Sequence, residues 1–185
     1  MGWRCCRCHW TVQAEGGDRH ATPFFFNGLR KITKELGVVF IVDEVQTGGG
    51  GTGKFWAHEH WNLTDSPDIV CFSKKLQAAG FYYKKELTPN MGYRIFNTWL
   101  GDPLRALQLR TILDVVESDK LLDNVNATGE YLLAGLRELE SVYGQKELIK
   151  NVRGLASFGA FDSKNPQTRD AIINELRNRG VEAGG

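Results

Sequence analysis

The stretch VVFIVDEVQ, residues 38–46, decides the fold class of this chain. Its first five residues are apolar without interruption, a pattern typical of a strand in a parallel sheet that is covered on both faces. Asp43 follows directly and marks the carboxyl end of the predicted strand. Ligands of open α/β sheets bind at this end of the strands, so the sequence places a carboxylate where a ligand is expected.

Helix and strand signals alternate from about Thr11 onward, which predicts an α/β layered fold. Thr22-Pro23 is an N-cap followed by proline at the first helical position, and the helix that it opens ends at Gly37. The other predicted elements are a buried strand at residues 69–72, a helix from Pro103, a long helix over about 120–143, strand-like alternation over 152–161, and a last helix from Asn165-Pro166 to Gly180.

The bulk composition fits a chain that buries one hydrophobic core. It has 185 residues, of which 42% are hydrophobic, and a formal net charge of +1. This charge balance gives no indication of nucleic acid or of an anionic membrane as a partner. No apolar run approaches the roughly 20 residues that a membrane-spanning helix requires. Neither class of partner is therefore expected.

The first ten residues differ in character from those that follow. Three of the four cysteines, Cys5, Cys6 and Cys8, lie here, whereas a secreted disulfide framework would spread them along the chain. A reducing compartment is therefore expected. Together with His9, these cysteines do not have the spacing of a standard zinc site, and no metal is expected. We expect residues 1–10 to be structurally foreign to the rest of the chain.

Lys74 is the second candidate residue, because it closes the second predicted buried strand. A lysine and a carboxylate at the ends of two buried strands can face one ligand. Lys74 and Asp43 suit pyridoxal phosphate, whose aldehyde forms a Schiff base with a lysine and whose ring nitrogen is held protonated by an aspartate. The alternative is that Lys74 and Lys75 are simply solvated, as most lysines are.

A glycine-rich loop, residues 47–53, lies between these two strands. It lacks the context of a dinucleotide fingerprint, and no phosphate-binding loop precedes Asp43, so a nucleotide site is not predicted. Two interpretations remain: flexibility that lets the backbone approach a ligand or a second subunit, or a plain surface turn. His58-Glu59-His60 resembles a metal triplet, but no third ligand is evident and a structural role is expected.

Several motifs resemble those of the class III pyridoxal-phosphate-dependent aminotransferases of fold type I. The family signature is matched at residues 40–48, at residues 67–70 and at Ser73-Lys74. A finer resemblance, to the family members of the animal mitochondrial type that act on 4-aminobutyrate, is carried by residues 13–18, 53–61, 72–75 and 93–103.

The resemblance implies a partial chain with an α/β fold and three parts. Residues 1–10 are an unmatched N-terminal segment. Residues 11–117 are part of the large mixed or parallel-sheet domain, which binds pyridoxal phosphate. Residues 118–185 are the start of the small C-terminal domain, which is truncated.

The resemblance also implies a role for five residues. Lys74 matches the lysine that forms the Schiff base with pyridoxal 5'-phosphate, and Asp43 matches the aspartate that pairs with the ring nitrogen. Gln46 matches the residue that contacts the phenolic oxygen of the ring. Thr98 matches a threonine that reaches the cofactor phosphate of the partner subunit, which implies a homodimer in the full-length protein. Glu15 matches a glutamate that pairs with a substrate-binding arginine.

The implied activity is transamination of 4-aminobutyrate with 2-oxoglutarate, giving succinate semialdehyde and glutamate, in the mitochondrial matrix. The implied partners are thus a small amino acid and a 2-oxo acid. Two alternatives stay open: another ω-aminotransferase that acts on ornithine or β-alanine, or an inactive fragment that associates with a full-length subunit through unpaired strand edges. The chain departs from the family at Trp10, where a glutamate is expected, and at Gly51, where cysteine or arginine is common.

Overall fold

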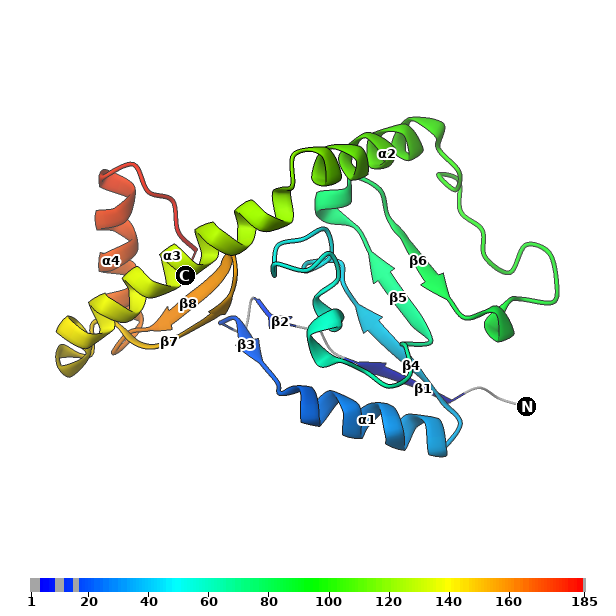
Figure 1. Cartoon of the computed structure of the whole chain (residues 1–185), viewed down its shortest axis with the longest axis horizontal. Coiled ribbons are helices and arrows are strands. Elements are labelled where there is room, and N and C mark those ends of the chain that lie inside the picture. The colour runs from blue at the N-terminus through cyan, green and yellow to red at the C-terminus, as the bar shows by residue number, and fades with distance from the viewer. Residues whose placement is uncertain (1–3, 9–11, 15–16, 185) are drawn as a thin grey trace.

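A four-stranded sheet occupies the right half of the view in Figure 1. The structure is a computed structural model that describes residues 4–8, 12–14 and 17–184. The sheet has the strand order β1-β4-β5-β6, and β4 pairs in parallel with both β1 and β5, while β6 runs antiparallel to β5. The carboxyl ends of β1, β4 and β5 therefore lie at one edge of the sheet. The strands are β1 (Arg4–Cys8), β4 (Val38–Asp43), β5 (Ile69–Phe72) and β6 (Gly80–Tyr83).

Helix α1 (Pro23–Glu35) packs on β4 and supplies part of the core (Figure 1). Its start follows the predicted cap, because Thr22 Oγ1 accepts a hydrogen bond from Phe25 N at 3.3 Å and Pro23 occupies the first turn. Phe26 stacks on Trp61, with ring centroids 3.6 Å apart and planes within 12° of each other. Burial of each large apolar side chain contributes about 1.5–3 kcal/mol, which holds helix and sheet together. The buried cluster comprises Phe26, Phe40, Val42, Trp61 and Val70.

A second group of elements lies beside the sheet (Figure 1). It is built on the long helix α3 (Leu121–Tyr143), which packs against the antiparallel hairpin of β7 (Lys150–Leu155) and β8 (Phe158–Asp162). Helix α2 (Pro103–Ser118) leads into α3, and the chain turns between them at Lys120, whose φ is 51°. The remaining regular elements are β2 (Val12–Gln13), β3 (Arg19–His20) and α4 (Pro166–Asn178), with short 3-10 turns between.

The glycine loop, residues 47–53, is largely buried, so its interpretation as a plain surface turn is wrong. Ser157, in the turn between β7 and β8, donates to Gly51 O from its backbone N at 3.2 Å and from its Oγ at 2.7 Å. A Cβ at Gly51 would lie 2.7 Å from the ring of Phe158. The missing side chain lets the loop backbone approach the hairpin of the same chain, whereas the prediction named a ligand or a second subunit.

The predicted helices and buried strands are present, while two segments differ from expectation. Residues 152–161 form parts of two strands rather than one, because the chain reverses at Ala156, whose φ is 50°. Residues 1–10 were expected to be foreign to the fold, yet Arg4–Cys8 form β1, with Cys6 in register with Phe40. A strand ladder needs only backbone groups, so an atypical composition does not prevent pairing. The cysteine side chains there and His9 lie outside what the structure describes.

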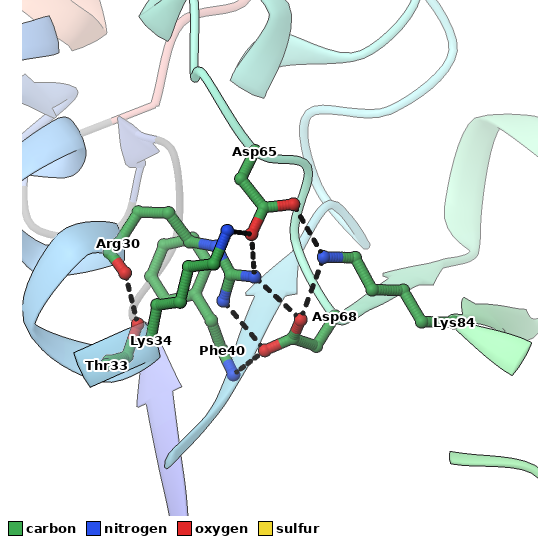
Figure 2. Close-up of polar contacts among 7 residues, drawn as sticks. All are labelled: Arg30, Thr33, Lys34, Phe40, Asp65, Asp68 and Lys84. Atoms are coloured by element: carbon green, nitrogen blue, oxygen red, sulfur yellow. Dashed lines mark hydrogen bonds and ion pairs between the residues drawn. The ribbon is translucent and has the colours of Figure 1, made fainter. Parts of the chain in front are cut away.

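An ion cluster ties α1 to the strands at the sheet edge opposite the carboxyl ends of β4 and β5 (Figure 2). Arg30 donates two parallel hydrogen bonds to Asp68, Nη1 to Oδ2 at 2.8 Å and Nη2 to Oδ1 at 2.9 Å. Its Nη2 also donates to Asp65 Oδ2 at 2.7 Å. Lys84, just after β6, contacts both carboxylates, at 2.8 Å and 3.1 Å. Asp68 Oδ2 also accepts from Phe40 N at 2.8 Å, so the cluster joins α1, β4, β5 and β6.

These contacts shift the pKa values of the cluster. Hydrogen bonds from Lys84, Arg30 and Lys34 hold the pKa of Asp65 well below its ordinary value. Partial burial would raise the pKa of Asp68, but hydrogen bonds from Arg30, a backbone amide and Lys84 outweigh burial and lower it. Burial would likewise lower the pKa of Arg30, yet its bonds to both carboxylates raise it. Arg30, Asp65 and Asp68 are therefore charged at neutral pH.

Gly129 marks the closest approach of α3 to the hairpin turn. A Cβ there would lie 2.3 Å from Ala156 Cα, whereas one at Gly135, on the same helix, would meet nothing within 4 Å. We expect Gly129→Ala to lower the free energy of unfolding by about 1–3 kcal/mol, because main chain cannot move aside cheaply. Gly135→Ala should raise it by about 0.5–1 kcal/mol through helix propensity. Urea denaturation measures both, and equal stability of the two variants would contradict this packing.

Candidate active site

Asp43 and the segment that carries Lys74 are neighbours at one edge of the sheet. Asp43 is the last residue of β4 and is paired in register with Cys71 of β5, which ends one residue later. Glu44 N donates to Cys71 O at 2.9 Å and joins the two strand ends beyond the ladder. Asp43 Oδ1 accepts a hydrogen bond from the backbone amide two residues further on, at 3.0 Å. The carboxylate is thus held at the edge where ligands of such sheets bind.

Lys74 has an unusual backbone conformation. Its φ is 49°, in the left-handed region, which costs a residue with a Cβ roughly 1–2 kcal/mol. Ser73 before it is extended, with φ −168°. The turn brings Lys74 Nζ to Gln46 Oε1, to which it donates a hydrogen bond. Lys120 and Ala156, at turns between other elements, have the same left-handed conformation, so this backbone positions Lys74 but does not by itself assign it a role.

The structure thus brings together three of the predicted site residues, Asp43, Gln46 and Lys74, which we call the strand-end site. They provide a carboxylate, an amide and a primary amine. Pyridoxal phosphate presents a basic ring nitrogen, a phenolic oxygen and an aldehyde, and these are the side-chain types that such groups require. The residues present therefore fit this cofactor chemically.

Glu44 is a charged residue beside the site whose role was not predicted. Its side chain is fully buried, with an exposed fraction of 0%. Its Oε1 accepts from His58 N at 2.7 Å and lies 2.8 Å from His58 Nδ1, and its Oε2 accepts from Thr47 Oγ1. These contacts tie the turn after β4 to the 3-10 turn η1 (Ala57–Trp61). The sequence feature that could have revealed this role was the second carboxylate next to the end of a buried strand, because a buried charge requires hydrogen-bond partners.

Glu44→Gln tests whether this buried carboxylate holds the turn. The amide keeps the shape but replaces one acceptor oxygen by an NH₂ group, which faces donors. We expect the free energy of unfolding to fall by about 1–3 kcal/mol. Glu130→Gln, an exposed position on α3, is the matched control and should stay within about 0.5 kcal/mol of the unsubstituted protein. Chemical denaturation measures the free energy of unfolding of both variants. An unchanged value for Glu44→Gln would show that the buried carboxylate does not hold the turn.

The other two predicted site residues are not part of the strand-end site. Thr98 lies in the chain between β6 and α2, where residues 90–101 are all exposed. Glu15 lies outside the described residues. The same loop exposes a group of large apolar side chains, namely Met91, Tyr93, Ile95, Phe96, Trp99 and Leu100.

The two histidines of the triplet have separate contacts. His58 binds Glu44, and His60 Nε2 lies 2.9 Å from Thr52 O. Within the described ranges, no group of three or more His, Cys, Asp or Glu side chains is placed to hold a metal ion. Among the same residues, none of the helices combines the length and apolar character needed to cross a membrane.

Solved structures share this architecture. The lysine aminotransferase from M. tuberculosis has a TM-score of 0.89 and 33% sequence identity, over 98% of this chain and 42% of that chain. The ornithine aminotransferase from Plasmodium yoelii has a TM-score of 0.81 and 25% identity, over 96% of this chain and 48% of that one. The fold is therefore the α/β fold of the fold type I pyridoxal-phosphate-dependent transferases.

Sequence comparison narrows this class to a family. Residues 10–185 match the model described as aminotransferase class-III, and the chain belongs to this family. The 4-aminobutyrate aminotransferase of Dictyostelium discoideum is 57% identical over 174 residues, which are 94% of this chain and 35% of that protein. The mitochondrial 4-aminobutyrate aminotransferase of Homo sapiens is 49% identical over 174 residues, 94% of this chain and 34% of that protein. The chain thus spans about a third of the length of these curated relatives.

Proposed function

We propose that this protein transfers the amino group of 4-aminobutyrate to 2-oxoglutarate, with pyridoxal phosphate as its cofactor. The products would be succinate semialdehyde and glutamate. The observation that carries the proposal is the placing of Asp43, Gln46 and Lys74 at one sheet edge. The identity of 57% to a 4-aminobutyrate aminotransferase supports the choice of substrate.

Each residue of the strand-end site has a separate proposed role. When bound, pyridoxal phosphate supplies an aldehyde that bonds to amines and a ring that accepts electrons. The Lys74 amine would hold the aldehyde and, once the substrate amine displaces it, would move the proton at the substrate carbon. Asp43 would keep the proton on the ring nitrogen. Gln46, which already contacts Lys74 Nζ, would orient the ring through its phenolic oxygen.

A second subunit would complete the site. Thr98 would reach the cofactor phosphate of the partner in a homodimer, and Glu15 would pair with a substrate-binding arginine. The exposed apolar side chains of residues 90–101 support an interface there, because patches of this kind mark association surfaces.

The domain division and the location are part of the same proposal. Residues 11–117 would belong to the large domain and residues 118–185 to the small one, and the turn at Lys120 between α2 and α3 supports a boundary there. A mitochondrial location rests on the names of the mammalian relatives.

Formation of glutamate from 2-oxoglutarate tests the proposed activity. The protein is loaded with pyridoxal phosphate and given 4-aminobutyrate, β-alanine or ornithine as the amino donor. We expect 4-aminobutyrate to give the highest rate and succinate semialdehyde to appear in equal amount. A higher rate with ornithine or β-alanine would show that this amino acid, rather than 4-aminobutyrate, is the preferred substrate. Absence of glutamate with every donor would refute the enzymatic proposal and favour a chain that only associates with another subunit.

A further inference from the structure

Lys75, the residue after Lys74, is exposed, yet its ammonium contacts two parts of the chain. Its Nζ donates a hydrogen bond to Gln46 O at 2.5 Å and lies 5.2 Å from the ring centroid of Phe158, within cation–π range. Two successive lysines therefore contact one residue. Lys74 binds the side-chain oxygen of Gln46, and Lys75 binds its main-chain oxygen.

The glycine loop leaves the space that Lys75 occupies. A Cβ at Gly51 would lie 3.3 Å from Lys75 Cε and 3.4 Å from its Nζ. A Cβ at Gly49 would lie 3.4 Å from Lys75 Cβ. The stem of Lys75 thus runs along the loop, and its ammonium lies between the loop backbone and Phe158 of the hairpin. These distances place Lys75 directly against the loop backbone.

The surroundings of this ammonium affect its charge. Partial burial is the main cause that lowers the pKa of Lys75, the positive charge of Lys74 lowers it further, and the negative charge of Glu44 opposes both. Lysine in its ordinary state has a pKa near 10.4, so the ammonium of Lys75 loses its proton at a lower pH than a surface lysine.

We propose that Lys75 is a positioning residue that holds the main chain at Gln46, so that the Gln46 amide stays against Lys74 Nζ. The inference rests on the proposed function, because the position of the Gln46 amide matters only if the reaction takes place at Lys74. The two bonds act on opposite ends of Gln46, one on its side chain and one on its carbonyl. Loss of the Lys75 bond would let the Gln46 backbone turn and withdraw its amide.

Amide hydrogen exchange of the protein without cofactor tests whether Lys75 holds the main chain at Gln46. Residues 43–52 contain amides with backbone partners, for example Gly48 N to Glu44 O at 2.8 Å. We expect exchange in this segment to become about tenfold faster in Lys75→Met, the change that loss of a hydrogen bond to a charged group can produce. Lys75→Arg keeps charge and donors and should stay within about twofold of the unsubstituted protein. Lys146→Met, at an exposed lysine, is the matched control. Equal exchange in Lys75→Met and Lys146→Met would overturn the proposal.

Trapping of the cofactor tests the link to Lys74. The protein is mixed with pyridoxal phosphate, reduced with borohydride and mapped by peptide mass over a range of pH. We expect less label at Lys74 in Lys75→Met and restoration in Lys75→Arg. Loss of the proton weakens the Lys75 hydrogen bond, so at alkaline pH the unsubstituted protein should label less at Lys74 than Lys75→Arg, which stays charged.

The two measurements separate the two proposals. No label at Lys74 in the unsubstituted protein would refute the proposed function. Hydrogen exchange alone would then test whether Lys75 holds the main chain at Gln46. Normal labelling of Lys74 in Lys75→Met, with the same pH profile as in the unsubstituted protein, would overturn the positioning role while leaving the proposed function intact.

Discussion

Replacing Lys74 by alanine is expected to lower the rate of amine transfer by at least about 10²–10⁴-fold, the range over which a positioned acid or base contributes. The variant lacks the amine that would bond to the cofactor aldehyde and the base that would move the substrate proton. Lys75 is not expected to replace it, because its Nζ is bound to Gln46 O and lies against Phe158.

Glutamate formation from 2-oxoglutarate measures this loss. Lys85→Ala removes an exposed lysine at the start of the 3-10 turn η3 (Lys85–Leu87) and serves as the control, with an expected rate equal to that of the unsubstituted protein. A Lys74→Ala variant that keeps more than about a tenth of the rate would show that Lys74 is not the catalytic amine.

Replacing Arg30 by methionine is expected to lower the free energy of unfolding by about 1.5–3 kcal/mol, because it removes the hydrogen bonds between a buried guanidinium and two carboxylates and leaves Lys84 and Lys34 as their cationic partners. The side chain of Arg30 is 6% exposed, and its guanidinium satisfies Asp65 and Asp68 together (Figure 2). Methionine fills much of the same volume, so the lost ionic contacts rather than a cavity would dominate the change. Arg110→Met, which removes an exposed pair with Asp114 on α2, is the control and should change stability by less than about 1 kcal/mol.

The effect of Arg30→Met should depend on pH. The pKa values of Asp65 and Asp68 are lowered in the folded state. A lowered carboxyl pKa contributes stability that is fully present above the unfolded pKa, about 3.9 for aspartate, and is lost as the pH falls toward the folded value. The stability difference between the unsubstituted protein and Arg30→Met should therefore be largest near neutral pH and shrink below about pH 4. A constant difference down to pH 3 would contradict the assignment of the effect to these carboxylates.

Local signals in the sequence predict most of the sheet and helices. The cap at Thr22, the continuous apolar run that ends at Asp43 and the proline at position 103 each specify an element within a few residues, and the structure has all three. Pairing of Arg4–Cys8 with β4 joins residues more than thirty positions apart and involves only backbone groups, so the sequence carries little signal for it. Strand β6 was not predicted either, because its three aromatic residues do not alternate with polar ones.

The strand-end site was predictable in its members but not in its contacts. Asp43 and Lys74 lie at the ends of apolar runs, and that position together with the family resemblance indicated them, whereas Gln46 was named through the resemblance only. The contact of Lys74 with Gln46 depends on a left-handed backbone at a lysine, which residue type does not predict. The Glu44 and His58 pair spans fourteen positions and forms only when the glycine loop is folded, so no local pattern could reveal it.

Borohydride reduction of the protein mixed with pyridoxal phosphate, followed by peptide mass mapping, tests the strand-end site most directly. If Asp43, Gln46 and Lys74 form the cofactor site, the pyridoxyl group will be confined to Lys74, and Asp43→Ala will reduce its yield. A label spread over exposed lysines such as Lys85 and Lys146, or no label at all, would contradict this assignment.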